Sequence, residues 1–268
     1  MKKPPSNLKE NPFRYSIGTR VRDKPFLKLL QPNQNDRILD IGCGLGYFSE
    51  LLSKRGARVW GVDADAASIA FSTRNIKGNF VIGRAESLPF KANAFDKILC
   101  SEVLEHIQDD ERALAEIFRV GRSGATVVIT TPALEGVFGS KIKRVAHQTV
   151  SDSSREFHYR DGYKADTLIS LMRNHGIKID EVKYTMVFFV ELLMGLTKVS
   201  YSLQGKNLER QADVLSVRNS LIFRFYKKLF PLMLFINSVD EFLPKILKGH
   251  MLIIKGTLEK SKLELDRG

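Results

Sequence analysis

Short apolar runs alternate with amphipathic segments between residues 37 and 131 of this 268-residue chain. Strands are predicted over 37–41, 58–62, 79–83, 95–100 and 125–130, and helices over 47–54, 66–76 and 109–120. A helix over 21–30 precedes this region, and a helix over 164–174 and strands over 177–185 and 250–259 follow it. Strands separated by helices of this length favour an α/β fold with a doubly wound parallel sheet covered on both faces.

The alternation divides the chain into five segments. They are an N-terminal arm and helix (1–36), a core (37–132), an insertion with a helix and the sixth strand (133–185), a helical cap (186–249) and the last strand with a tail (250–268). The first 20 residues are expected to be loosely held until something packs on them. The cap carries an apolar stripe at helical spacing, with basic residues on the other faces. The stripe comprises Val214, Val217, Leu221, Phe225 and Leu232.

Charge and cysteine content indicate which partners and which cellular compartment suit the chain. The net charge of +12 favours polyanionic surroundings, such as nucleic acid, an anionic membrane or an acidic substrate, or serves solubility alone. Cys43 and Cys100 are not placed for a disulfide, which favours a reducing compartment. The N-terminus has no apolar stretch typical of a secretory signal, and the run from Leu229 to Ile236 is far shorter than the roughly 20 residues that span a bilayer. We expect a cytoplasmic protein, with peripheral membrane binding as the alternative.

A glycine-rich turn follows the first predicted strand. Gly42, Gly44 and Gly46 would let the backbone approach a ligand closely, and the next helix offers free N–H groups and a positive dipole end. The spacing differs from the G-x-G-x-x-G pattern of dinucleotide sites. Asp63 ends the second strand about 20 residues later, where a carboxylate can accept both hydroxyls of a ribose; the alternative role for Asp63 is a helix N-cap or a turn. Asp40 lies at the carboxyl end of the first strand.

Five motifs in order over residues 37–131 carry a family resemblance: ILDIGCGLGYFSELL, GVDAD, AESLPF, FDKILCSEVLEHI and EIFRV. They resemble class I S-adenosylmethionine-dependent methyltransferases, and most closely the broad group that contains the ubiquinone and menaquinone biosynthesis methyltransferases. The resemblance implies a Rossmann-like, doubly wound, mostly parallel seven-stranded sheet, with an antiparallel last strand and here a helical insertion between strands six and seven. It implies S-adenosylmethionine as the cofactor and leaves the substrate open.

The resemblance also implies roles for individual residues. Gly42, Cys43 and Gly44 would pass under the methionine and ribose of the cofactor, with Gly46 completing the turn and Asp40 nearby. Asp63 would hold the ribose hydroxyls. The adenine would be bordered by Ala64, Ala85 and Glu86. Ser101 would approach the methionine amino group.

One departure from the family pattern concerns the adenine. Family members often carry an acidic residue two positions before Glu86, where it accepts from the adenine amino group, and this chain has Arg84. A guanidinium cannot accept a hydrogen bond. This contact is therefore lost or passes to Glu86.

Two histidines are candidates for a base or an acceptor-orienting residue. His106 follows the fourth strand and His158 lies in the insertion; a structural role is the alternative for each. Glu102, Glu105 and His106 have the i, i+3, i+4 spacing that some quinone O-methyltransferases resembling this chain use for a divalent metal. Because the E-x-x-E-H run is also common without a metal, no metal is predicted.

The cap over 186–249 stands where this fold usually has a short hairpin. We predict a lid over a small lipophilic acceptor, such as a quinone, an isoprenoid or a lipid, that contacts an anionic membrane through basic residues; a plain helical cap and a homodimer interface are the alternatives. No appended RNA-binding module or base-stacking motif is found, so nucleic acid is not the expected partner. The predicted activity is methyl transfer, with oxygen favoured as the acceptor atom. The alternatives are an RNA or protein methyltransferase and a catalytically inactive cofactor-binding scaffold.

Overall fold

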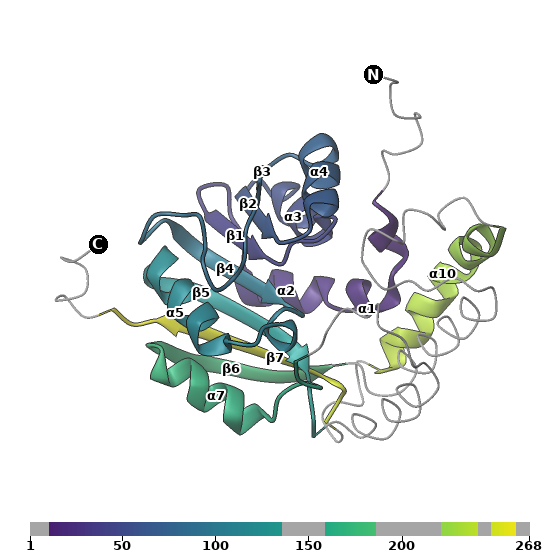
Figure 1. Cartoon of the computed structure of the whole chain (residues 1–268). Coiled ribbons are helices and arrows are strands. Elements are labelled where there is room, and N and C mark those ends of the chain that lie inside the picture. The colour runs from purple at the N-terminus through teal and green to yellow at the C-terminus, as the bar shows by residue number, and fades with distance from the viewer. Residues whose placement is uncertain (1–10, 136–158, 186–220, 241–247, 261–268) are drawn as a thin grey trace.

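A seven-stranded mixed sheet forms the centre of the protein (Figure 1). The computed structural model describes residues 11–135, 159–185, 221–240 and 248–260. The strand order is β3-β2-β1-β4-β5-β7-β6, with β1 to β5 parallel to one another and β7 antiparallel to both β5 and β6. The predicted fold class is confirmed. The strands are β1 (Arg37–Ile41), β2 (Arg58–Asp63), β3 (Asn79–Ile82), β4 (Phe95–Ser101), β5 (Gly121–Pro132), β6 (Ile177–Thr185) and β7 (Met251–Leu258).

The helices agree with the sequence pattern to within a few residues wherever both can be compared. The largest difference among the strands is β5, which begins four residues before the predicted strand at Ala125. The helices are η1 (Pro12–Tyr15), α1 (Ile17–Arg20), α2 (Asp23–Leu30), α3 (Tyr47–Ser53), α4 (Ala66–Asn75), η2 (Leu104–His106), α5 (Asp110–Val120), α7 (Ala165–Asn174) and α10 (Leu221–Asp240).

Adjacent residues of each central strand point to opposite faces of the sheet, as the two-residue period of a strand requires. Leu39 and Ile98 pack with α5 and α7 on one face. Ile38 and Leu99 pack with α2 and α3 on the other. Because both faces are covered, the strands read as continuous apolar runs rather than alternating ones.

The order of the strands places a topological switch point between β1 and β4. The chain moves outward from β1 through β2 to β3 and then returns to β4 on the other side of β1. Open α/β sheets bind ligands at the carboxyl ends of the strands beside such a point. The glycine-rich turn leaves β1 here, and β4 ends here at Ser101.

The structure describes the exposure of one residue of the predicted apolar stripe of the cap, Leu232. Leu232 is 56% exposed, whereas Phe230 and Met233 are buried against the N-terminal helices. The segment 229–236 is apolar on nearly all sides, so its periodicity could not select the face that the rest of the protein covers. Val214 and Val217 lie outside the described residues, and the side chains of Leu221 and Phe225 are not described either. Among the helices described, none combines the length and the hydropathy needed to cross a membrane.

Candidate functional site

The glycine-rich turn joins β1 to α3 in a conformation that favours glycine. Gly42, Gly44 and Gly46 have φ of 66°, 50° and 70°, a left-handed region that costs other residues about 1–2 kcal/mol. A Cβ on Gly42 would also lie 2.2 Å from Cγ2 of Val103, and one on Gly46 would lie 2.5 Å from Cδ1 of Ile76. Bare backbone therefore forms this part of the switch point.

Asp63, at the end of β2, is bound to the turn. Its Oδ2 accepts from the Gly44 N–H at 2.7 Å and its Oδ1 accepts from the Asp65 N–H at 2.8 Å. A carboxylate offers about four acceptor positions, so roughly two remain for a ligand at this half-buried side chain. Burial raises the pKa of Asp63, while the two backbone N–H donors oppose the rise. The N-cap that was the alternative for Asp63 is instead Asp65, which accepts from two N–H groups at the start of α4.

Asp40 lies beneath the turn. It is 2% exposed, and its Oδ2 accepts from the Ser49 hydroxyl of α3 at 2.6 Å. Burial, assisted by the nearby charge of Asp63, raises the pKa of Asp40 to about 7. The Cys43 thiol is also buried, and burial raises its pKa as well. Asp40 is thus a buried carboxyl, bonded to α3, with a pKa of about 7.

The residues predicted to border the adenine follow β2 and β3. Ala64 is exposed directly after Asp63, and Ala85 is buried. Glu86 is half-buried and forms an ion pair with Arg84, with 2.7 Å between Nη2 and Oε1. Arg84 therefore occupies one oxygen of the carboxylate to which the adenine contact was expected to pass.

Arg22 was not foreseen from the sequence, yet it reaches the end of β4. Its Nη1 donates to Oγ of Ser101 at 2.8 Å, and Ser101 lies 3.0 Å from Oγ1 of Thr130. Thr130 in turn donates to Oε1 of Glu102 at 3.5 Å. The guanidinium also stacks over the ring of Phe48, 5.4 Å from its centroid. Burial lowers the pKa of Arg22, opposed by the charge of Glu102. A cation and a carboxylate are thus joined through two hydroxyls where the methionine amino group was expected.

The segment that carries Arg22 is anchored to the glycine-rich turn and α3. Asn11 is 3% exposed and donates to the Leu45 carbonyl at 2.7 Å. Arg14 forms an ion pair with Glu50, and the Tyr47 hydroxyl donates to Asp23 at 2.8 Å. Residues 11–20, expected to be loosely held until something packs on them, are thus packed against the glycine-rich turn, α3 and α10; residues 1–10 lie outside the described ones. Polar partners on α3, which no local pattern reveals, hold this segment.

The run Glu102, Glu105 and His106 does not form a single helical turn. Glu102 has a left-handed φ of 58°, and only η2 follows it. Glu105 is 1% exposed and accepts from Oγ1 of Thr131 at 3.2 Å, toward the sheet. His106 is half-buried in η2. In the described part of the chain, no three His, Cys, Asp or Glu side chains are grouped as metal ligands. His158 lies outside the described residues.

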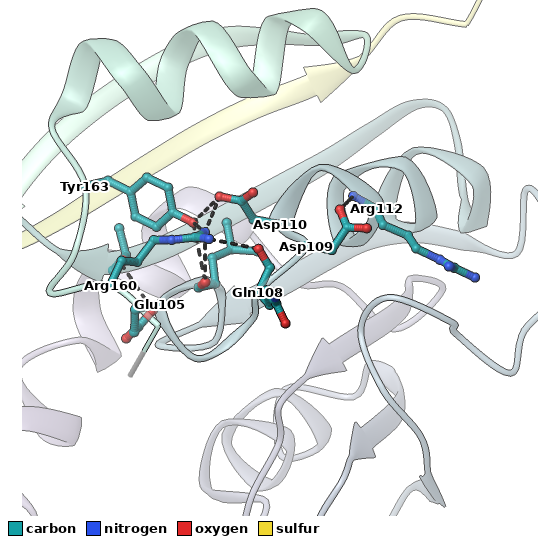
Figure 2. A network of polar contacts seen from close by, with 9 residues as sticks. Glu105, Gln108, Asp109, Asp110, Arg112, Arg160 and Tyr163 are labelled. Atoms are coloured by element: carbon teal, nitrogen blue, oxygen red, sulfur yellow. Dashed lines mark hydrogen bonds and ion pairs between the residues drawn. The ribbon is translucent and has the colours of Figure 1, made fainter. Parts of the chain in front are cut away.

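A polar network joins this turn to the chain that follows the insertion (Figure 2). Arg160 donates to Asp110 and to the Tyr163 hydroxyl, and to the Gln108 carbonyl at 3.0 Å. The Tyr163 hydroxyl donates to the same Asp110 carboxylate at 2.5 Å, and the Arg160 N–H donates to the Glu105 carbonyl at 3.3 Å. The network fixes the turn after β4, and so the backbone position of His106, to the start of α5.

Comparison with known proteins agrees with this geometry. Residues 39–129 match the methyltransferase-domain family. The chain is 33% identical over 101 residues to a ubiquinone biosynthesis O-methyltransferase of Hahella chejuensis. The aligned region covers 35% of this chain and 42% of that protein. It is also 33% identical over 99 residues to a malonyl-(acyl-carrier protein) O-methyltransferase of Serratia marcescens, covering 37% and 39%.

A solved structure is similar in fold to nearly the whole chain. Phosphoethanolamine N-methyltransferase 2 of Haemonchus contortus, in complex with S-adenosyl-L-methionine, matches with a TM-score of 0.60 at 18% identity over 94% of this chain and 56% of that one. The chain spans 39% to 54% of the lengths of the first four curated relatives that it matches. Residues 39–129 thus match a methyltransferase-domain family, and the strand order and glycine-rich turn resemble those of class I S-adenosylmethionine-dependent methyltransferases.

Proposed function

We propose that this protein binds S-adenosylmethionine and transfers its methyl group to a small lipophilic acceptor, preferably to an oxygen atom. The observation that carries the proposal is the bond from Asp63 to the Gly44 N–H, because it places a carboxylate beside bare backbone at the switch point. The names of the two relatives described above, both O-methyltransferases, favour oxygen as the acceptor atom.

The residues present fit the cofactor. Asp63 retains acceptor capacity for the two ribose hydroxyls, and the left-handed conformations of Gly42 and Gly44 bring bare backbone to the place proposed for the rest of the nucleoside. Ser101 and Arg22 provide polar atoms for the methionine end. When bound, S-adenosylmethionine supplies a methyl group on a positively charged sulfur, so the protein contributes mainly by positioning the acceptor in line with it.

The acceptor side of the site is the turn after β4. His106 is our proposed base or acceptor-orienting residue, because η2 presents it directly after the strand that borders the glycine-rich turn. Removal of a proton by such a residue speeds methyl transfer to a hydroxyl by about 10²–10⁴-fold. His158 remains a second candidate from the sequence alone.

The test is transfer of labelled methyl from S-adenosylmethionine into fractionated cell extract, counted separately in lipid, polar small-molecule, protein and RNA pools. We expect label in the lipid pool, and we expect Asp63→Ala to abolish it. Asp65→Ala is the matched control: it removes the cap of α4, worth about 1 kcal/mol, but none of the carboxylate proposed to bind ribose. Label only in RNA or protein would refute the lipophilic acceptor and point to the basic surface instead.

Cofactor binding is measured separately from turnover. A thermal shift with S-adenosylmethionine or its demethylated product should be present in the native protein and reduced in Asp63→Ala. Binding without transfer into any pool would favour the inactive scaffold, and no shift with either ligand would refute the cofactor assignment itself.

A further inference from the structure

The helix α10 exposes large apolar side chains on the same face as two cations. Leu232 is 56% exposed and Phe235 is 71% exposed, and Arg224 and Lys228 are also exposed. At 3.6 residues per turn these four side chains lie within an arc of about 80° around the helix axis. The cations precede the apolar pair along the helix, so the face is basic toward its beginning and apolar toward its end. We call these four residues the outer face of α10.

The opposite side of α10 is fixed to the body of the protein. Phe230 and Met233 are buried in the cluster that contains Val21 and Phe26, and the ring of Phe230 packs edge-on against Tyr15, with 5.6 Å between the centroids. Figure 1 shows α10 beside α1, at the end of the molecule beyond the N-terminal helices. The outer face is therefore displayed outward by a helix whose inner side is already packed.

The charge and hydrophobicity of the outer face indicate which kind of partner it can bind. None of the exposed residues described on α10 is acidic, so a second copy of the same face would offer the two cations no opposite charge. A partner rich in both negative charge and apolar groups satisfies the cations and the apolar side chains at once. The interface of an anionic bilayer has this composition, because its headgroups attract Lys and Arg and its acyl boundary accepts Leu and Phe.

We infer that the outer face of α10 is a docking surface for an anionic lipid bilayer, with Leu232 and Phe235 inserted at the acyl boundary and Arg224 and Lys228 among the headgroups. A helix docked in this way lies at the interface, its apolar residues buried by about 5–10 Å. The net charge of +12 adds long-range attraction to the same surface.

Docking through α10 would bring the candidate site close to the lipid. The inner side of α10 packs on the segment around Tyr15 and Val21, and that segment continues into Arg22, which reaches Ser101 at the end of β4. For a lipophilic acceptor, this arrangement shortens the path from the bilayer to the site. That step rests on the proposed function, whereas the docking itself does not.

The experiment is cosedimentation of the full chain, without cofactor, with vesicles of phosphatidylcholine and with vesicles in which part of it is replaced by phosphatidylglycerol. We expect binding to the anionic vesicles that weakens as salt is raised. Leu232→Ser with Phe235→Ser should reduce partitioning at least tenfold, on the order of the loss from two partly buried apolar side chains. Arg224→Gln with Lys228→Gln should reduce it by about tenfold or more.

Matched controls separate the outer face from general surface properties. Ile82 on β3 is 59% exposed, so Ile82→Ser removes a comparable apolar side chain elsewhere. Arg74→Gln with Lys77→Gln removes the same charge from exposed positions at the end of α4. Both controls should bind vesicles nearly as the native chain does.

Three outcomes would overturn the docking proposal. They are no binding to anionic vesicles, equal losses in the control and α10 variants, and concentration-dependent self-association in sedimentation velocity that Leu232→Ser with Phe235→Ser abolishes. The last result would identify the outer face as a contact between copies. Because vesicle binding is scored without cofactor, its failure is distinguishable from failure of methyl transfer.

Discussion

Asp40→Asn should change how the stability of the protein depends on pH. The native Asp40 carboxyl is 2% exposed and titrates at about 7, compared with an ordinary value of 3.8 for its pKa. A carboxyl whose pKa is raised by folding stabilises the protein fully below the ordinary pKa, and this contribution is lost as the pH rises through the folded value. From pH 5 to pH 8, a single group with these two pKa values loses about 2–3 kcal/mol of stability. The Asn variant cannot ionise at this position and should not lose it.

The assay is urea unfolding of both proteins at several pH values between 5 and 8, with the free energy of unfolding extrapolated to water. Histidines and other titrating groups occur in both proteins, so the difference between the two free energies isolates Asp40. We expect the native protein to lose about 2–3 kcal/mol relative to Asp40→Asn across this range. A difference that stays constant from pH 5 to pH 8 would refute the reasoning, because it would mean that burial does not hold Asp40 protonated at the lower pH.

Three further substitutions test the turn, the polar network and the unforeseen cation. Gly42→Ala should destabilise the protein by about 2–4 kcal/mol, since it combines a left-handed φ with a 2.2 Å contact to Val103; a melting temperature equal to the native one would contradict this. Arg160→Met should cost about 1–3 kcal/mol in urea unfolding, because it leaves Asp110 partly buried without its ion pair, and Asp110→Asn should be milder. Arg22→Met should weaken cofactor binding in calorimetry while the melting temperature changes little, and Arg22→Lys should restore binding only in part; unchanged binding in both would remove Arg22 from the site.

The strands and the glycine-rich turn were predictable because their determinants are local. A continuous apolar run such as Arg37–Ile41 fits a strand buried on both faces, and the structure has a strand over these residues. Gly42 follows it with a conformation that only glycine adopts at low cost. The placement of Asp63 at the end of β2 followed from the same alternation, and its bond to the Gly44 N–H is the three-dimensional outcome.

Other parts of the site depend on contacts between distant residues, and the sequence pattern does not encode these. Arg22 reaches Ser101 across 79 positions of the chain, and Asn11 reaches Leu45 across 34; both look like solvent-exposed polar residues when only their neighbours are read. The E-x-x-E-H run suggested one face of a helix, yet Glu102 is left-handed and Glu105 turns toward Thr131. Tertiary hydrogen bonds overrode the local periodicity in each case.

The orientation of α10 also depends on contacts with distant residues that the sequence pattern does not encode. Around Leu229–Ile236 almost every residue is apolar, so the sequence could place Leu232 in the core as readily as Phe230. Phe230 and Met233 are the residues that pack against the N-terminal helices. A helix that only packed on these helices would need apolar residues on one side alone. The exposed apolar side, which continues into Arg224 and Lys228, lies away from the contacts of Phe230 and Met233, and the docking proposal gives it a lipid surface to contact.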